Sequence, residues 1–237
     1  MPSAIVSTIA KYAALGFLVS TYKTLPFAYL VRFYYHVIHL FSHYPSFKRN
    51  NRTNTFGFTT PSTLFKWVGI DSYVSPLEVD MNIHKSNSSY FLDLDIARTK
   101  LVSQVFEKFL FNYYDNVHGE FKSSGIGNIP YIPPATVKCT FRRELKPFQR
   151  FRIESKVFAW DRKWLFVLSK FVSGKDGQKL HTVAVTKYVF KKGRITIPPE
   201  QIIKECGLWS EDAQKENEAN YKLVQHLSDT DEIEKLL

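Results

Sequence analysis

Several side chains suited to acid–base chemistry crowd into residues 80–87 of this sequence: Asp80, Asn82, His84 and Asn87. They stand between a strand-like run, 71–80, and a long apolar run with helical spacing. A strand-to-helix junction matters chemically because the first turn of a helix offers unpaired backbone N–H groups and a partial positive charge. Those groups can hold a developing oxyanion, while a nearby carboxylate or imidazole can move a proton or activate water. We therefore expect the chemistry within residues 79–98.

The elements around this junction predict an α+β fold. Apolar residues recur at helical spacing through 87–111 in a band wide enough to predict burial on most sides, and Ser86 or Asn87 is a suitable N-cap. Strand-like stretches with turn signals between them then follow: 131–143, 148–160, 163–173 and 179–190. A strand, a long helix and an antiparallel meander, in that order, indicate a sheet that covers one helix.

An apolar arm precedes the domain. Residues 4–20 and 25–41 are apolar runs of about 17 residues each, the lower limit for a membrane-spanning helix. The arm could be an anchor followed by an interfacial helix, a tight hairpin, or a cleaved targeting peptide. The first 31 residues contain no arginine and residues 20–23 form a poor cleavage site, so we favour retained membrane attachment through residues 1–43. The alternative is a buried helical hairpin packed on the domain.

Composition divides the rest of the chain. Residues 44–60 show no clear periodicity and predict a linker, so we expect the domain, residues 61–199, to fold without the segment before Thr60. Residues 200–237 predict an acidic, polar, partly helical tail.

Charge and motifs exclude several classes of protein. The net charge of +10 occurs without a helix-turn-helix, zinc-finger or RNA-stacking signature, so we expect no nucleic-acid partner and favour a membrane surface. The two cysteines, Cys139 and Cys206, give no disulfide framework or metal-ligand spacing, and we expect no metal or cofactor. The sequence lacks the Gly-x-Ser-x-Gly elbow of α/β-hydrolases, and the glycines at 125 and 127 are not a dinucleotide fingerprint.

The junction resembles the start of the central helix in hotdog-fold acyl thioesterases. The matching pattern is Asp80-x-Asn82-x-His84-x-x-Asn87-x-x-Tyr90, which is similar to that of acyl carrier protein thioesterases. Asp95 and Arg98 fit the acidic-x-x-Arg of the 4-hydroxybenzoyl-CoA thioesterase-like branch, and residues 141–147 resemble its second strand. The resemblance covers about residues 68–198. With the apolar arm, the chain is most similar to the membrane-anchored thioesterase superfamily member six proteins.

This resemblance implies a five-stranded sheet wrapped around the 87–111 helix, in a homodimer with its active sites near the interface. It implies that Asp80 orients or activates water or acts as nucleophile, and that His84 and Asn87 position the thioester and water. Backbone N–H groups near Asn87 would form the oxyanion hole. Asn82, Ser86 and Tyr90 would contact substrate, although Ser86 stands where many relatives have the first of two consecutive asparagines.

A purely structural interpretation competes with the catalytic one. Asp80 and Asn87 could simply cap and tighten the turn, and His84 could be a packed imidazole. Asp95 and Arg98 are better explained as an ion pair at helical i,i+3 spacing than as catalytic groups. Two hypotheses follow: an acyl-CoA thioesterase tethered to an intracellular membrane, with the endoplasmic reticulum favoured and the mitochondrion as alternative, or a non-catalytic hotdog protein that binds acyl groups or a protein partner.

Overall fold

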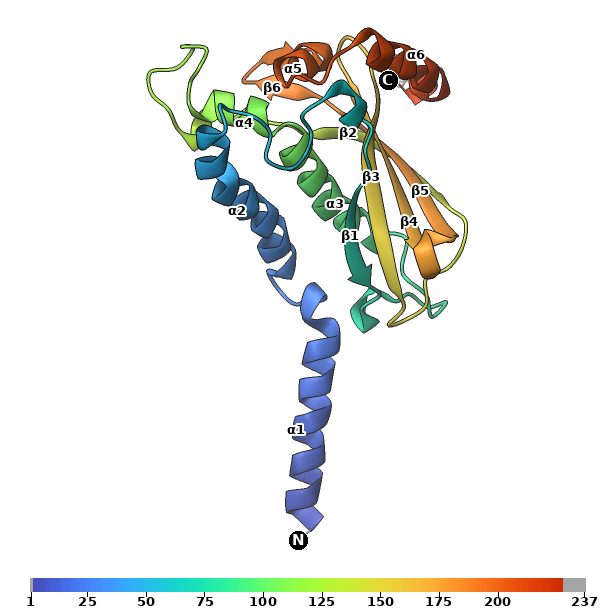
Figure 1. Cartoon of the computed structure of the whole chain (residues 1–237). Coiled ribbons are helices and arrows are strands. Elements are labelled where there is room, and N and C mark those ends of the chain that lie inside the picture. The colour runs from blue at the N-terminus through green and yellow to red at the C-terminus, as the bar shows by residue number, and fades with distance from the viewer. Residues whose placement is uncertain (1, 228–237) are drawn as a thin grey trace.

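A five-stranded antiparallel sheet forms the centre of the computed structural model, which describes residues 2–227 (Figure 1). The strand order is β1-β3-β4-β5-β2, so that β1 and β2 are the edges. The strands are β1 (Val68–Tyr73), β2 (Pro134–Phe141), β3 (Arg150–Trp160), β4 (Leu165–Ser173) and β5 (Lys179–Tyr188). The helix α3 (Ser89–Val105) lies along the sheet. This arrangement is the expected α+β hotdog fold.

Apolar side chains of α3 pack against the inner face of the sheet. Tyr90, Leu94 and Ala97 recur at helical spacing and contact a cluster that includes Phe151 and Phe171. Leu94 and Phe171 are fully buried, and each such side chain stabilises the fold by about 1.5–3 kcal/mol. The helix periodicity seen in the sequence therefore corresponds to the face that the sheet covers.

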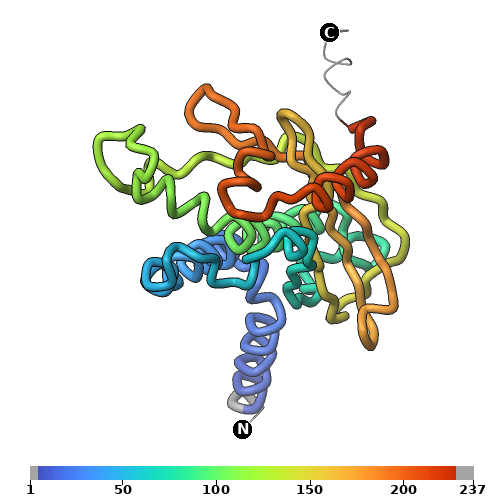
Figure 2. Tube along the Cα trace, turned by 45° about the horizontal axis from the view of Figure 1, so that its top comes forward, coloured from blue at the N-terminus to red at the C-terminus, as the bar shows by residue number. Residues whose placement is uncertain are grey.

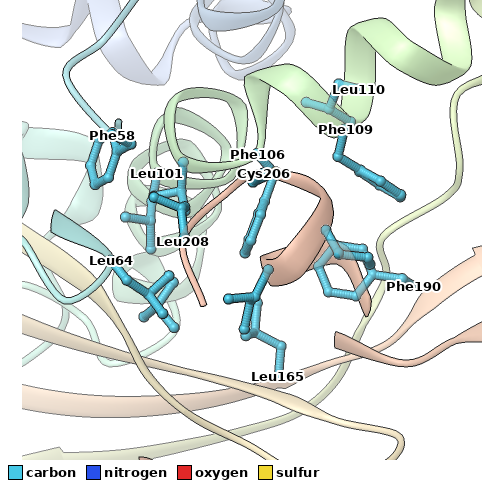
Figure 3. Packing of buried hydrophobic residues seen from close by; sticks show 14 of the residues in the cluster. Phe58, Leu64, Leu101, Phe106, Phe109, Leu110, Leu165, Phe190, Cys206 and Leu208 are labelled. Atoms are coloured by element: carbon cyan, nitrogen blue, oxygen red, sulfur yellow. The ribbon is translucent and has the colours of Figure 1, made fainter. Parts of the chain in front are cut away.

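The predicted helix 87–111 is divided in two. The helix α3 ends at Val105 and α4 (Glu107–Tyr114) begins after Phe106, whose backbone leaves the helical region at φ −104° and ψ 24°. The ring of Phe106 is buried and lies edge-on to Phe190, with 5.5 Å between ring centroids (Figure 3). Tertiary packing accompanies this break, and no glycine or proline marks it in the sequence, so periodicity alone could not predict it.

The strand predicted over 71–80 is also shorter than expected. Strand β1 starts earlier, at Val68, and ends at Tyr73, after which Pro76–Glu78 forms a 3₁₀ turn with a capping box from Ser75. The backbone N–H of Ser75 donates to Glu78 Oε2 at 2.9 Å instead of to a neighbouring strand, and Pro76 has no backbone N–H, so the pairing does not continue to residue 80. The remaining 3₁₀ turns are Tyr22–Thr24, Pro61–Thr63, Ile126–Asn128, Lys175–Gly177 and Gln225–Leu227.

The two apolar runs of the arm form two helices with different surroundings. The helix α1 (Pro2–Thr21) projects away from the domain, and its side chains from residue 5 to 19 are exposed (Figures 1 and 2). Residues 5–24 have the length and the mean hydropathy, 1.3, of a membrane-spanning helix. The helix α2 (Ala28–Arg49) instead packs along α3 and buries Leu40 and Phe47. The second apolar run is therefore part of the domain.

Residues 44–60, predicted as a linker, are packed against the domain. The helix α2 continues through Pro45 to Arg49, and Phe47 and Phe58 are buried in the main hydrophobic cluster. The carbonyl oxygen of the Asn54 side chain accepts hydrogen bonds from the backbone N–H groups of Phe56 and Phe58. Side-chain hydrogen bonds to backbone, which leave no periodic pattern in a sequence, hold this segment in place.

The C-terminal segment packs at the end of the sheet opposite α1 (Figure 1). The hairpin β6 (Phe190–Lys192) and β7 (Ile195–Ile197) leads into α5 (Pro199–Glu205) and α6 (Glu211–Val224). The Asn217 side chain of α6 bonds both the backbone N–H and the carbonyl of Trp160, at 2.7 and 3.1 Å. The tail predicted over 200–237 is thus helical and packed up to residue 227, and residues 228–237 lie outside the described residues.

Candidate active site

The junction is a tight loop in which the side chains of Asp80 and His84 lie close together. Val79 and Lys85 form an isolated antiparallel bridge, and the backbone N–H of Asp80 donates to the carbonyl of His84 at 3.0 Å. Ile83 adopts a left-handed conformation, φ 59°, which closes the turn. As a result His84 Nδ1 lies 3.4 Å from Asp80 Oδ1. The sequence spacing of four residues here reflects a loop and not a helix face.

The Asp80 carboxylate is fixed by its own loop. Its Oδ1 accepts a hydrogen bond from the backbone N–H of Asn82 at 2.9 Å, the local turn that an aspartate favours. Asn82 itself is exposed at the tip of the loop, next to Met81 and Ile83. The structural interpretation of Asp80 as a turn-forming residue is therefore correct, and the same carboxylate also lies within ion-pairing distance of the His84 ring, whose Nδ1 is 3.4 Å from the Lys85 carbonyl as well.

An open pocket of about 480 Å³ lies beside this loop, which we call the junction pocket. Its lining consists of His84, Lys85, Asn87, Tyr90 and residues 141–144. Three of the six predicted site residues thus come together in one pocket. Among the described residues, Asp80, Asn82 and Ser86 lie outside the lining. The Ser86 hydroxyl instead shares a hydrogen bond with that of Ser88, at 3.0 Å.

The walls of the junction pocket supply both charge and a neutral hydroxyl. Arg142 and Arg143 are exposed on one wall, and Glu144 Oε1 lies 3.9 Å from His84 Nε2. On another wall, burial raises the pKa of Tyr90 to about 12, so its hydroxyl is neutral at physiological pH. The pocket therefore combines an imidazole close to Asp80, a neutral phenol and two guanidinium groups.

Two backbone N–H groups at the start of α3, next to this pocket, are unpaired. The N–H groups of Lys85 and Ser86 donate to Leu145 and Glu78, and those of Ser89 and Tyr90 donate to preceding carbonyls. Within the described part of the chain, the N–H groups of Asn87 and Ser88 have no acceptor. Unpaired N–H groups at a helix N-terminus suit a developing negative charge. The predicted oxyanion hole near Asn87 is thus compatible with the backbone.

Next to the junction pocket lies a buried ion cluster that the sequence did not indicate. It comprises Lys23, Arg32, Glu78, Lys85 and Asp93. Lys85 Nζ lies 3.0 Å from Glu78 Oε1 and 2.9 Å from Asp93 Oδ2. Lys23 Nζ lies 2.9 Å from Glu78 Oε2, and Arg32 bonds the other oxygen of Asp93 at 2.8 Å. The cluster therefore ties the connector after α1 to the junction and to α3.

The three basic residues of this cluster determine the pKa of Asp93. Burial alone would raise the pKa of Asp93, but Lys85, Lys23 and Arg32 outweigh it and lower that pKa to about 2. The one signal in the sequence was indirect: basic residues occur before Asp71, and acidic ones do not.

A second, mostly apolar cavity of about 530 Å³ lies between α2, α3 and the loop that precedes β2. Val37, Val102 and Ile132 are among its lining residues, and Asp95 and Arg98 supply polar groups. The predicted i,i+3 ion pair between Asp95 and Arg98 is confirmed, and Arg98 also donates to Thr186. This α2–α3 cavity can accept an apolar chain alongside α3. Among the described residues, no group of histidine, cysteine and acidic side chains could hold a metal ion.

Comparison with known proteins decides the family. Residues 74–204 match the Thioesterase-like superfamily. The chain is 39 % identical over 225 residues to the probable thioesterase YBR096W of Saccharomyces cerevisiae, covering 92 % of this chain and 89 % of that protein. This chain belongs to the Thioesterase-like superfamily. It is a thioesterase by family, so the predicted class of enzyme, a thioester hydrolase, is confirmed at this level.

The chain is also similar to two further thioesterases. It is 40 % identical over 152 residues to the thioesterase lcsJ of Purpureocillium lilacinum, covering 61 % of this chain and 49 % of that protein. The crystal structure of the YbaW probable thioesterase from Escherichia coli matches with a TM-score of 0.48 and 12 % identity, covering 59 % of this chain and 96 % of that one.

Proposed function

We propose that this protein hydrolyses acyl-CoA thioesters at the junction pocket while α1 tethers it to a membrane, as expected of the membrane-anchored thioesterase branch. The observation that carries the proposal is the pairing of Asp80 with His84 at a pocket whose lining also includes Arg142 and Arg143. Guanidinium groups suit the phosphates of coenzyme A because they bind such anions with paired hydrogen bonds.

In the proposed reaction, His84 is the catalytic residue and Asp80 is a positioning residue. The thioester carbonyl oxygen accepts hydrogen bonds from the N–H groups of Asn87 and Ser88. His84 takes a proton from a water molecule, whose oxygen attacks the carbonyl carbon. The negative charge that develops on the carbonyl oxygen is stabilised by those donors. The carbon–sulfur bond then breaks, and the imidazolium returns its proton to the leaving thiolate.

In this proposal the Asp80 carboxylate, 3.4 Å from His84 Nδ1, stabilises the imidazolium that forms and favours the ring orientation that turns Nε2 toward the pocket. This assignment differs from the expectation that Asp80 itself acts on water, and it follows from the position of Asp80 outside the pocket lining. We propose that the acyl chain runs along α3 toward the α2–α3 cavity, because the lining of that cavity is mostly apolar.

The test measures hydrolysis of a series of acyl-CoAs by the full-length protein in detergent. The release of free thiol is the readout. We expect His84→Ala and Asp80→Asn to lower kcat by about 10²–10⁴-fold, the usual contribution of general acid–base catalysis. Asp71→Asn is the matched control, because Asp71 is an exposed carboxylate on β1. Circular dichroism shows whether each variant is folded. Tight binding of acyl-CoA without turnover by the unmodified protein would favour the non-catalytic hotdog alternative.

A role for Asp80 through His84 has its own readout. Asp80→Asn should change the pH profile of kcat/KM relative to the unmodified protein, whereas damage to the fold alone would lower the whole profile without altering its shape. Rescue by Asp80→Glu would support a charge that orients the ring.

Attachment to the membrane is supported by the exposure of α1 and by the length and apolar composition of residues 5–24. Full-length protein should float with lipid vesicles and resist carbonate extraction, and protein lacking residues 1–19 should lose the resistance to carbonate. For location we favour the endoplasmic reticulum, with the mitochondrion as alternative, because the first 31 residues contain none of the arginines of a transit peptide. Microscopy of the full-length protein tests this.

We also propose a homodimer. The strand β2 is an edge of the sheet, and Lys138, Thr140 and Phe141 on it are exposed, so its outer side is available to a second copy. Analytical ultracentrifugation of the protein in detergent should give the mass of a dimer.

A further inference from the structure

Exposed apolar side chains surround the place where α1 leaves the domain. We call them the anchor-proximal surface: Tyr22, Phe27, Leu77, Met81, Ile83 and Phe148. They are between 56 % and 93 % exposed. They come from distinct segments, namely the connector after α1, the 3₁₀ turn before the junction, the junction loop and the turn before β3. Large apolar groups gathered on a protein surface mark an interaction site.

Hydrogen bonds show that these segments lie side by side. The Tyr73 hydroxyl donates to the carbonyl of Ser20 at 2.8 Å, which fixes the end of α1 to the end of β1. The backbone N–H of Lys85 donates to Leu145 at 2.8 Å, which joins the junction loop to the turn before β3. Figure 1 shows these loops at the end of the sheet from which α1 projects. The anchor-proximal surface is therefore one end of the domain.

The backbone of this surface is unusual. Phe27, Ile83 and Phe148 have positive φ angles of 66°, 59° and 61°. This left-handed region disfavours bulky and β-branched residues, and glycine or asparagine normally occupies it. Here large apolar side chains occupy it and point into solvent, where the fold gains nothing from them. Such strain is typical of functional positions, and an apolar environment outside the protein would account for it.

Charge at the same end favours a lipid surface. Exposed basic residues on the segment 142–150 outnumber its one acid, Glu144: they are Arg142, Arg143, Lys146 and Arg150. Clusters of basic residues beside apolar side chains attract anionic lipid headgroups. Phe148 and Arg150 also share a shallow depression with Val19 and Tyr22, so this basic and apolar set adjoins α1 directly.

We propose that the anchor-proximal surface inserts into the headgroup region of the bilayer and that the junction pocket therefore opens at the membrane interface. The inference rests on the membrane tether of the proposed function. The buried ion cluster supports it, because Lys23 and Asp93 hold the connector after α1 to α3. Since α1 enters the bilayer beside these loops in this proposal, the same bilayer is the apolar environment that their exposed side chains contact. An acyl thioester held in the bilayer then reaches the pocket without crossing water.

The experiment places one fluorescent label on a cysteine at 83 or 148 in the full-length protein, reconstituted into phosphatidylcholine vesicles that contain phosphatidylserine. The matched control is Ile195→Cys, because Ile195 is an exposed apolar residue, 61 % accessible, on the hairpin at the opposite end of the domain. Cys139 is changed to Ala in all variants. Cys206 remains, because burial raises the pKa of its thiol to about 12 and prevents labelling.

We expect spin-labelled lipid to quench the labels at 83 and 148 and aqueous iodide to leave them unchanged, with the reverse result at 195. Equal access of iodide to all three positions in vesicle-bound protein would overturn the inference while leaving the tether and hydrolysis intact. Protection from iodide without quenching by lipid would also contradict it, since a second copy would then cover the surface. Failure of the full-length protein to float with vesicles would overturn the tether itself and this inference with it.

Discussion

Lys23, in the connector after α1, places its Nζ 3.2 Å from Oδ2 of Asp93 on α3, and both side chains are buried. Removing two such charges from water costs several kcal/mol per ion, which close pairing must offset. The pair joins the segment that leaves the domain to the helix that lines the junction pocket. The same buried ion cluster therefore contacts both the connector after α1 and the lining of the junction pocket, through Lys23 and Lys85.

Asp93→Ala should be strongly destabilising. It removes the acid that pairs with Arg32 and leaves Lys23 and Lys85 with Glu78 alone. Removing one partner of a buried ion pair costs about 3–5 kcal/mol. Denaturant unfolding in detergent, followed by circular dichroism, measures the loss. Asp71→Ala is the control, because the exposed pair of Asp71 with Arg152 is expected to contribute about 0–1 kcal/mol. Equal losses in the two variants would contradict a stabilising role of the cluster.

The same aspartate predicts a loss of stability in acid. Its pKa is about 2 in the folded protein and has an ordinary value of 3.8, so the folded state binds the proton less readily than the unfolded state. The contribution of about 2 kcal/mol is complete above pH ~4 and is lost as the pH falls toward ~2. Thermal melting between these pH values should show the decline. In Asp93→Asn, which cannot titrate here, this part of the pH dependence should disappear.

Truncation separates the two helices of the arm. Removal of residues 1–19 should leave a folded domain, because α1 is exposed and Lys23 is retained. Removal of residues 1–59 should unfold it, because Phe47 and Phe58 leave the core at a cost of about 1.5–3 kcal/mol each, together with the ion pair of Arg52 and Asp115. Melting curves of the two truncated proteins decide this. If the protein lacking residues 1–59 melted cooperatively at the same temperature as the full-length protein, residues 44–60 would be the linker that the sequence predicted.

The sequence predicted the fold better than the site. Periodicity found the α3 face of Tyr90 and Leu94, because helix burial leaves a regular pattern. The geometry of Asp80 and His84 depends on the left-handed backbone of Ile83, a conformation that isoleucine disfavours and that no local rule predicts. The buried ion cluster was missed because Lys23 and Asp93 are 70 residues apart, and only tertiary structure brings them together.

Arg142 and Arg143 provide a test of how the junction pocket recognises its substrate. If their guanidinium groups bind the phosphates of coenzyme A, the double change to Ser should raise KM for acyl-CoA by roughly tenfold or more, since hydrogen bonds to charged groups contribute about 1.5–3 kcal/mol, while kcat changes little. Steady-state kinetics in detergent measure both constants. Arg194→Ser is the matched control, because Arg194 is exposed on the β6–β7 hairpin.

A second substrate separates phosphate recognition from other effects of the same change. An acyl thioester of N-acetylcysteamine carries the same reacting bond without phosphates, so its KM should be equal for the unmodified protein and for the Arg142→Ser, Arg143→Ser variant. A rise in KM for both substrates would mean that the two arginines shape the pocket and do not recognise phosphate. An unchanged KM for acyl-CoA would mean that the phosphates bind elsewhere. Arg142 and Arg143 would then have only the proposed role of binding lipid headgroups.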